Sequence, residues 1–324
     1  MLDSLVPQVH EDGAAVEPDV VGDVRDAAAV RRALESVDSV VHLASRVGVG
    51  QSMYEMAEYT SANSVGTAVL LEALAERPVR KLVVASSMSI YGEGAYREGD
   101  PGERTREQLE RREWDFAGYE PVPTPETKRA ALSSIYALTK YDQERACLVA
   151  GAAYGIPTVA LRLFNVYGPG QALSNPYTGV LAIFASRLLN GRPPRVFEDG
   201  EQRRDFVSVR DVARAFRLAL EGDGADGRAV NVGSGRSVTV NALAELLGRT
   251  VGKEIAPEVT GEFRVGDVRH CFADVSLARE TLGFEPQVAL EDGMAELADW
   301  LAGRAPVDRV DEATAELARR GLTG

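Results

Sequence analysis

Tyr136 and Lys140 are the residues whose types and spacing most directly indicate chemistry in this chain. They stand four positions apart in a segment, 134–146, that contains neither Gly nor Pro, and residues four apart share one face of a helix. An ammonium group beside a phenol lowers the pKa of the phenol, which would let Tyr136 take a proton from an alcohol. With 4 Lys and 10 Tyr in 324 residues, this spacing is expected by chance about 0.1 times. That rarity favours a catalytic pair over an incidental pair on an amphipathic helix.

The segments that would position this pair alternate between strand and helix patterns. Asp26 can cap a helix over 27–36, and a longer helical pattern runs through 53–76. Strands and helices in this order predict βαβ units and an α/β fold. Short apolar runs, typical of strands buried on both faces of a parallel sheet, cover 39–44, 80–87 and 158–165.

Other parts of the chain depart from this alternation. The segment 92–132 is rich in Gly and Pro and holds a charged run at 103–113; we expect a long loop with a short solvated helix. Beyond residue 170 the pattern becomes less regular, with a strand predicted over 203–209, which indicates a second, smaller unit. A helical pattern in the tail, 305–324, carries no recognisable chemistry.

The composition excludes several classes of protein. The formal charge of 36 − 49 = −13 argues against nucleic acid and against an anionic membrane as the main partner. Cys147 and Cys271 are far apart and the three His are unpaired, so neither a disulfide framework nor a metal site is expected. No run approaches 18 apolar residues and no leader pattern is seen. We therefore expect a soluble cytoplasmic protein.

A series of short motifs follows along residues 1–300. They are Gly22–Asp26, His42–Ala44, Asn63 with Gly66 and Thr67, Ser86–Gly92, Tyr136 with Lys140, Arg162–Pro169, Arg204–Val207, Asn231–Gly235 and Arg264–Asp267. Each motif alone is weak. In this order they resemble the extended short-chain dehydrogenase/reductases, and within them the NAD-dependent nucleotide-sugar epimerases and dehydratases.

The resemblance implies a Rossmann-like, doubly wound parallel sheet, incomplete at its N-terminus, with a smaller α/β domain for the substrate. The NAD-binding domain would cover 1–166, with 205–230 returning to it. The nucleotide-sugar-binding domain would comprise residues 167–204 and 231–304, followed by the helical tail 305–324. The family also implies a homodimer, formed through helices at 53–76 and 132–153.

The same resemblance assigns roles in catalysis and cofactor binding. Tyr136 would be the catalytic base, Lys140 its partner and a ribose ligand, and Ser87 the residue that hydrogen-bonds the reacting hydroxyl at the end of a strand. Asp3 would take the adenosine ribose hydroxyls, which selects NAD over its 2′-phosphorylated relative. The other cofactor residues would be Asp23, Val24, Leu43, Ala44, Ser45, Asn63 and Phe164. For the apolar residues that flank the adenine and the pyrophosphate, a core role is an equal alternative.

The nucleotide sugar would bind to a further set of residues. Arg204 and Arg264 match positions that grip the nucleotide diphosphate, for which a guanidinium offers a bidentate fork. The full set comprises Ser87, Asn165, Val196, Phe197, Arg204 and Arg264.

Residues 87–89 indicate which reaction the resemblance implies. Dehydratases of the family carry Thr-Asp-Glu at these positions, whereas this chain has Ser-Met-Ser. A 4,6-dehydratase is therefore not expected. The Ser, Tyr and Lys set suits reversible oxidation of a sugar alcohol, with NAD regenerated in each cycle. We expect 4-epimerisation of a nucleotide sugar, with a dTDP-6-deoxyhexose such as dTDP-L-rhamnose favoured. A UDP-hexose 4-epimerase and a nucleotide-sugar 4-ketoreductase are the alternatives.

One feature of the family does not occur in the sequence: a Gly-x-x-Gly-x-x-Gly loop after the first strand. Such glycines let the backbone approach the cofactor pyrophosphate, and the strand before the loop lies at the centre of the sheet. We therefore expect that the chain as given does not bind NAD normally. Two explanations follow: a coding sequence that begins about 30 residues further upstream, or a non-catalytic homologue with a binding or regulatory role.

Overall fold

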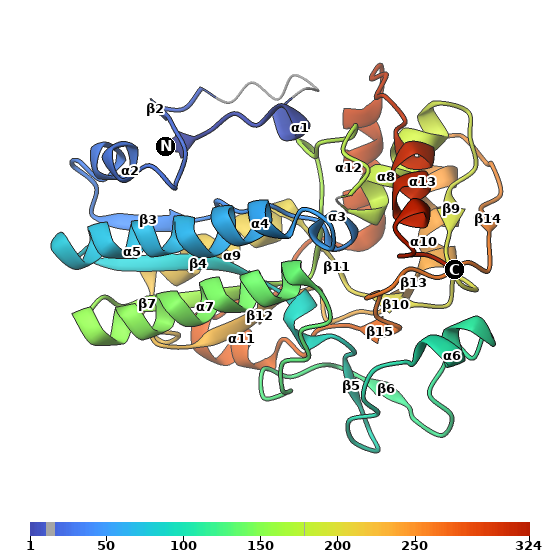
Figure 1. Ribbon diagram of the computed structural model, residues 1–324, viewed down its shortest axis with the longest axis horizontal. Helices are drawn as coiled ribbons and strands as arrows, with labels where there is room; N and C mark the ends of the chain where they lie inside the picture. Colours follow the sequence, from blue (N-terminus) through green and yellow to red (C-terminus); the bar gives the residue numbers. More distant parts are fainter. Residues whose placement is uncertain (11–16, 178) are drawn as a thin grey trace.

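Four parallel strands form the main sheet of the computed structural model, which describes residues 1–10, 17–177 and 179–324 (Figure 1). Every residue of its central strand β4 is buried, because helices cover both faces of the sheet. The predicted α/β class and the three predicted strands are confirmed. In spatial order the strands are β12 (Ala229–Val232), β7 (Thr158–Leu163), β4 (Lys81–Ser87) and β3 (Ser39–His42).

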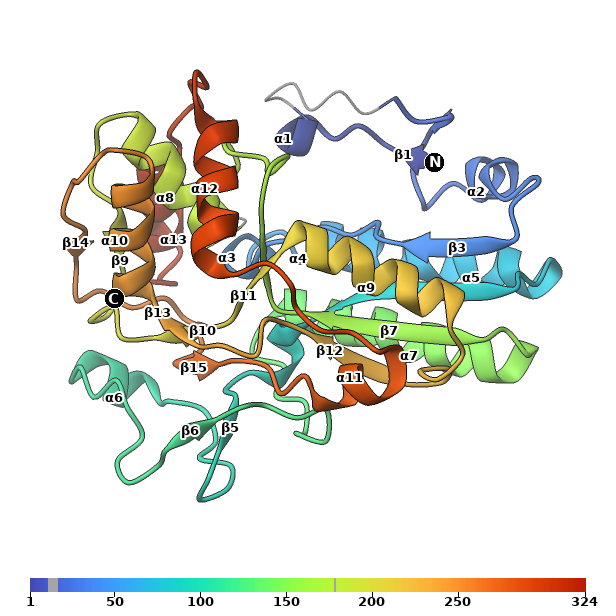
Figure 2. The ribbon, with the colours of Figure 1, turned by 180° about the vertical axis from the view of Figure 1, so that it is seen from behind.

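Side chains alternate along β4, so each face of the sheet has its own core. Val83 and Ala85 pack with α9 and α11 on one face, which Figure 2 shows from behind. Leu82 and Val84 point the other way and pack with α5 and α7. These helices are α5 (Gly66–Glu76), α7 (Ile135–Tyr154), α9 (Val209–Glu221) and α11 (Ser276–Leu282).

The first two strands form a separate pair. β1 (Leu2–Asp3) and β2 (Val20–Val21) are parallel to each other, and neither joins the main sheet. Within the described part of the chain, β3 has β4 on one side and no strand on the other. The Asp26 carboxylate caps α2 (Ala27–Ala33) by accepting hydrogen bonds from two amides of its first turn, as predicted.

The single helix predicted over 53–76 is wrong in one respect, because a π-helical turn interrupts it. α4 (Met56–Tyr59) leads into the turn η1 (Thr60–Val65), which precedes α5. Asn63 of this turn is fully buried, and its side chain accepts a hydrogen bond from the Arg46 amide (2.6 Å) and donates one to the Arg46 carbonyl (3.1 Å). The turn thereby fixes the loop that follows β3.

The second unit is built around three helices that share an apolar core. Short strands connect these helices to the segments around them. The helices are α8 (Val180–Leu189), α10 (Val240–Thr250) and α12 (Leu290–Leu301), and the strands are β8 (Asn165–Tyr167), β9 (Arg195–Val196), β10 (Arg203–Arg204), β11 (Phe206–Ser208), β13 (Val238–Thr239), β14 (Glu258–Val259) and β15 (His270–Cys271).

Two predicted boundaries in this region need correction. Asn231 and Val232, expected in the second unit, belong to β12 and pair with β7 in the main sheet. The strand predicted over 203–209 divides into β10 and β11 at Asp205. The Asp205 carboxylate is fully buried and accepts hydrogen bonds from backbone amides that include those of Ser234 (2.7 Å) and Gly235 (2.9 Å).

The segment 92–132 packs along the second unit through ion pairs that bury their arginine side chains. Arg104 lies 2.8 Å from Glu198, and both side chains are at most 3% exposed. Arg269, which is 1% exposed, lies 2.7 Å from Asp115. The segment holds β5 (Ala95–Tyr96), β6 (Pro121–Val122) and, within the charged run, the predicted short helix α6 (Arg106–Glu110).

The remaining elements are short helices, and the last of them forms the tail. They are α1 (Pro7–His10), α3 (Val49–Ser52), η2 (Met88–Tyr91) and α13 (Val310–Arg319). Within the described ranges, none of the helices is both long enough and apolar enough to cross a membrane. The same ranges contain no group of three or more His, Cys, Asp or Glu residues placed to hold a metal ion.

Candidate active site

The first turn of α7 presents Tyr136, with Lys140 one turn later. Ser134 caps the helix by accepting a hydrogen bond from the Ala137 amide (3.1 Å). The Tyr136 amide donates to the Ser52 hydroxyl (3.0 Å). These two hydroxyls satisfy amides that the start of any helix leaves without a partner, so the position of Tyr136 along the helix is fixed.

Ser87, at the carboxyl end of β4, lies close enough to Tyr136 to influence the pKa of its phenol. The Ser87 hydroxyl accepts hydrogen bonds from the amide (3.2 Å) and hydroxyl (2.9 Å) of Ser89. Burial raises the pKa of Tyr136, and the nearby Ser87 hydroxyl opposes that rise. The pKa of Tyr136 is therefore raised by burial, not lowered as the spacing predicted.

The Lys140 ammonium, which should produce that lowering, points to a different partner. The side chain is 3% exposed, and its Nζ donates to Gln143 Oε1 at 2.6 Å. Burial lowers the pKa of Lys140 to about 8. The Gln143 amide in turn donates to the Ala44 carbonyl (3.1 Å) and lies 3.1 Å from His42 Nε2. Gln143 thus joins α7 to the loop after β3.

Several of the residues predicted to bind the cofactor are close together. Lys140 reaches the loop of Ala44 and Ser45 through Gln143, and Asn63 holds the next residue of that loop, Arg46. Asn63 also donates to the Thr139 hydroxyl of α7 at 3.0 Å. One network therefore joins α7, the π-helical turn and the loop after β3.

The residues predicted for the adenosine half lie on and after the β1–β2 pair. The Asp3 carboxylate accepts from the Leu5 amide (2.7 Å), and Asp23 forms an ion pair with Arg25 (2.6 Å). Val24 packs against Gly66, where a Cβ would lie 2.4 Å from its side chain. Asp3 and Lys140 offer the acceptor and the donor that ribose hydroxyls require, so the residues fit a dinucleotide.

Two predicted apolar cofactor residues have contrasting environments. Leu43 is 59% exposed beside the open edge of the sheet, which leaves it available to a ligand. Phe164 is 3% exposed, and its ring lies 6.4 Å from that of Tyr91 within a buried cluster. Phe164 therefore has the environment of a core residue.

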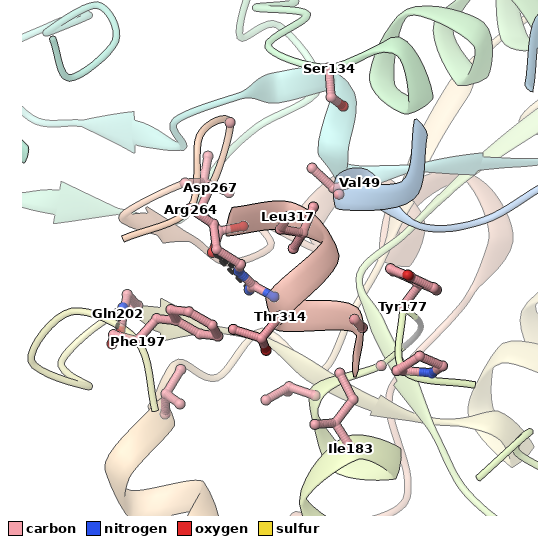
Figure 3. Close-up of a pocket in the computed structure, with 18 of the residues that line it drawn as sticks. Val49, Ser134, Tyr177, Ile183, Phe197, Gln202, Arg264, Asp267, Thr314 and Leu317 are labelled. Carbon is pink, nitrogen blue, oxygen red and sulfur yellow. Dashed lines mark hydrogen bonds and ion pairs between the residues drawn. The ribbon is translucent and has the colours of Figure 1, made fainter. Parts of the chain in front are cut away.

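A cavity of about 260 Å³ lies between the two units (Figure 3). Ser89 and Ser134, the neighbours of Ser87 and Tyr136, line one end of it. The five other residues predicted to bind substrate line the same cavity: Asn165, Val196, Phe197, Arg204 and Arg264. Residues from separate motifs thus meet around one space.

The charged side chains gather at the end of the cavity that holds Phe197. The Arg264 guanidinium carbon lies 4.5 Å from the centre of the Phe197 ring, and its nitrogen is 2.7 Å from Asp267. Arg204 donates to the carbonyls of Val268 and Arg269, and burial lowers its pKa. Two cations beside an aromatic ring suit a nucleotide diphosphate.

Two buried acceptor atoms on the cavity wall have no hydrogen-bond partner within the described chain: Asn165 Oδ1 and Gln202 Oε1. A buried acceptor without a partner is costly, so both are available to hydroxyl or N–H groups of a ligand. Asn165 was predicted from its motif. Gln202 was missed, although it stands two residues before Arg204 within a segment that the resemblance used.

Other wall residues were missed because they carry no chemical group. Val49 and Gly50 belong to α3, Met53 follows it directly, and Leu317 belongs to the tail helix α13. Figure 3 shows Val49 and Leu317 on neighbouring sides of the space. Their apolar types resemble those of ordinary core residues, so the sequence offers no signal that separates the two roles.

Three comparisons place these features among known proteins. The profile of the NAD dependent epimerase/dehydratase family matches residues 2–233. The dTDP-L-rhamnose 4-epimerase of Burkholderia thailandensis is 37% identical over 320 residues, which cover 93% of this chain and 87% of that protein. The structure of UDP-glucose 4-epimerase from Thermotoga maritima with UDP-glucose is 34% identical with a TM-score of 0.72, covering 86% of this chain and 82% of that one.

A variant of UDP-glucuronic acid 4-epimerase from Bacillus cereus, solved with UDP-4-deoxy-4-fluoro-glucuronic acid and NAD, is 26% identical with a TM-score of 0.72. It matches 87% of this chain and 80% of that one. The family is NAD dependent, and the compared structures hold nucleotide sugars, in one case together with NAD. The chain belongs to the NAD dependent epimerase/dehydratase family, as its motifs predicted.

Proposed function

We propose that this NAD-dependent nucleotide-sugar epimerase inverts carbon 4 of a dTDP-6-deoxyhexose, with dTDP-L-rhamnose as the favoured substrate, through a 4-keto sugar. Ser87, Tyr136 and Lys140 are the proposed catalytic residues. Asn165, Phe197, Arg204 and Arg264 would hold the nucleotide sugar, since all four line the cavity to which Ser89 and Ser134 also contribute. The 37% identity to a dTDP-L-rhamnose 4-epimerase supports the choice of substrate.

The geometry supports a proton-transfer role for Tyr136. Ser87 lies close enough to Tyr136 to lower the pKa of its phenol, so one sugar oxygen at carbon 4 would contact both. Tyr136 takes the hydroxyl proton as carbon 4 becomes a ketone and returns it after the sugar has turned. Because burial raises the pKa of Tyr136, its ionisation needs a nearby cation. Lys140, which donates to Gln143, would have to turn towards Tyr136 to supply one. Bound NAD supplies a reversible hydride acceptor.

The observation that carries the substrate assignment is the apolar wall that Val49, Met53 and Met88 contribute to the cavity. Among the described wall residues, the charged ones are Arg195, Arg204, Arg264 and Asp267; Arg195 and Arg264 lie over the Phe197 ring, and Asp267 is paired with Arg264. Carbon 6 of a hexose is two bonds from carbon 4, so its substituent must lie near Ser87, where Val49, Met53 and Met88 provide apolar contacts. A carboxylate there would be desolvated without a partner, whereas a methyl group fits.

A comparison of substrates tests this proposal. Purified protein with NAD should epimerise dTDP-L-rhamnose faster than UDP-glucose, and UDP-glucuronate least, as measured by NMR of the sugar products. Tyr136→Phe should lower kcat by about 10²–10⁴-fold, whereas Tyr141→Phe, on the same helix, should retain it. Faster turnover of UDP-glucose would support the UDP-hexose alternative instead.

The same experiment separates the other two alternatives. Net consumption of NADH with a 4-keto sugar, without epimerisation, would identify a 4-ketoreductase. Absence of both turnover and saturable NAD binding would support a non-catalytic binding or regulatory role for the chain.

We also propose a homodimer formed through the helices at 53–76 and 132–153. Leu138 and Val149 lie on one face of α7, 11 residues apart, and are 48% and 59% exposed. Val65, at the end of the π-helical turn, is 50% exposed. Exposed apolar side chains on adjacent helices are typical of an interface. Light scattering should give twice the chain mass, and Leu138→Glu should shift it to the monomer; a monomeric wild-type protein would contradict the proposal.

A further inference from the structure

The C-terminal segment 306–324 contributes one wall of the cavity, although the proposed mechanism does not use it. Val310, Ala313 and Leu317 of α13 are each no more than 7% exposed. Together with Thr314 and Leu322 they line the same cavity as Asn165 and Arg264. In Figure 3 the side chains of Thr314 and Leu317 lie between Phe197 and Val49. The tail therefore borders the space between the nucleotide end and the catalytic end.

The tail is fixed to the second unit along its whole length. Asp311 lies 2.7 Å from Arg187 and 2.9 Å from Arg192. At its end, the Phe263 amide donates to the Gly324 carbonyl (2.8 Å), and the Val265 amide donates to the Leu322 carbonyl (2.9 Å). These bonds flank Arg264, which itself pairs with Thr323 in an antiparallel bridge. The tail thereby holds the backbone that carries Arg264.

The tail also contacts the first unit across the cavity. A Cβ added to Gly50 of α3 would lie 3.3 Å from a methyl carbon of Leu317, so the two residues are in direct contact. The Arg320 guanidinium carbon lies 4.3 Å from the centre of the Tyr54 ring, within the range of a cation–π interaction. Leu317 thus belongs to the same wall as Val49, Gly50 and Met53, beside the catalytic end.

We propose that Leu317 is a specificity-determining residue that contacts the substituent at carbon 6 of the sugar and favours a methyl group over a hydroxymethyl or carboxylate group. The proposal rests on the proposed function, which places carbon 4 beside Ser87 and Tyr136. Carbon 6 then lies at the end of the cavity that Leu317 closes. A buried leucine offers dispersion contacts to a methyl group and leaves a hydroxyl or carboxylate without a hydrogen-bond partner.

Leu317→Ala in the full-length protein tests the proposal. Removing the leucine methyl groups should lower the ratio of kcat/KM for dTDP-L-rhamnose to that for a dTDP-hexose with a 6-hydroxyl by about 10-fold or more. Binding of dTDP alone should stay within about 2-fold of wild type, because it reaches the Phe197 end only. An unchanged ratio, or an equal loss of dTDP and nucleotide-sugar binding, would overturn the proposal.

Leu297→Ala provides the matched control for stability. Leu297 is fully buried in the core of the second unit and does not line the cavity. This variant should lower Tm at least as much as Leu317→Ala while keeping the wild-type ratio of the two substrates. If the wild-type protein turns over neither sugar, the proposed function fails. In that case, calorimetric binding of the same two nucleotide sugars still measures the preference that Leu317 imposes.

Discussion

Replacing Lys140 with methionine should stabilise the cofactor-free protein. Burial lowers the pKa of Lys140 from 10.5 to about 8, a difference of about 2.5 units that corresponds to about 3 kcal/mol at about 1.4 kcal/mol per unit. Methionine has a similar length and no charge to desolvate. It loses the hydrogen bond from Nζ to Gln143, worth about 1 kcal/mol. Lys140→Met should therefore raise the free energy of unfolding near neutral pH by about 2 kcal/mol, while it removes the proposed cation beside Tyr136.

The pH dependence gives this prediction a defined sign. The pKa of Lys140 is lower in the folded protein than in the unfolded chain, so between pH 8 and 10.5 the unfolded chain binds the extra proton. The penalty that the buried Lys140 charge imposes on stability is therefore absent above pH 10.5, grows as the pH falls, and is complete below about pH 8. Urea unfolding at pH 7 and pH 9.5 should show that the advantage of Lys140→Met over wild type shrinks at the higher pH.

Lys81→Met is the matched control, because Lys81, like Lys140, is a buried lysine of the described chain. Lys81 is 3% exposed, but it forms an ion pair with Asp226 and donates to the Gly222 carbonyl at 2.7 Å. Its removal leaves those acceptors without a partner and should destabilise the protein by about 1–3 kcal/mol. If Lys140→Met destabilises the protein as Lys81→Met does, the reasoning about unpaired burial is refuted.

Three further predictions concern the packing of the first unit. Arg162→Met should cost about 3–5 kcal/mol in urea unfolding, because it strands Glu144, whose side chain is 0% exposed and paired with Arg162 at 2.6 Å; a loss below about 1 kcal/mol would contradict this. The His42 ring should stay neutral from pH 8 to 5 in NMR titrations, since burial lowers its pKa to about 3. Its contribution to stability is complete above pH 6.5 and declines as the pH falls towards 3. A titration midpoint near 6.5 would show that the ring is solvated. Replacing a helical glycine with alanine usually stabilises the helix by up to about 1 kcal/mol. Gly151→Ala should instead destabilise the protein by about 1–3 kcal/mol, because the new Cβ would lie 2.2 Å from Thr158 Oγ1. An increase in Tm would refute the predicted clash.

Sequence patterns predicted the parts of the fold that depend on local periodicity. The buried strands at β3, β4 and β7 were recognisable because strands covered on both faces consist of continuous apolar residues. The cap at Asp26 and the short helix in the charged run were also predicted correctly. In contrast, the π-helical turn at Asn63 depends on a tertiary hydrogen bond to Arg46, which no local pattern encodes.

The candidate site was predictable where residues carry functional groups within motifs. Asn165, Phe197, Arg204 and Arg264 come from distant segments, yet their motifs placed all four on one cavity. The direction of the Tyr136 pKa shift was not predictable, because spacing on a helix does not reveal that Lys140 turns towards Gln143. The tail was missed for a different reason: Leu317 acts through shape and apolar contact, which its amphipathic pattern shares with any surface helix.

The separate pair β1–β2 has a consequence for how the protein moves. Two isolated strands are marginally stable in water, so this pair should open at a lower free energy than the four-stranded sheet, and its amides should exchange with solvent first. Asp3, the residue predicted to bind the adenosine ribose, lies on this pair. The cofactor would then bind only those molecules in which the β1–β2 pair is formed. The apparent affinity for the cofactor is therefore reduced in proportion to the fraction of such molecules. The catalytic helix and the sheet beneath it would remain rigid while the adenosine end of the site orders around its ligand.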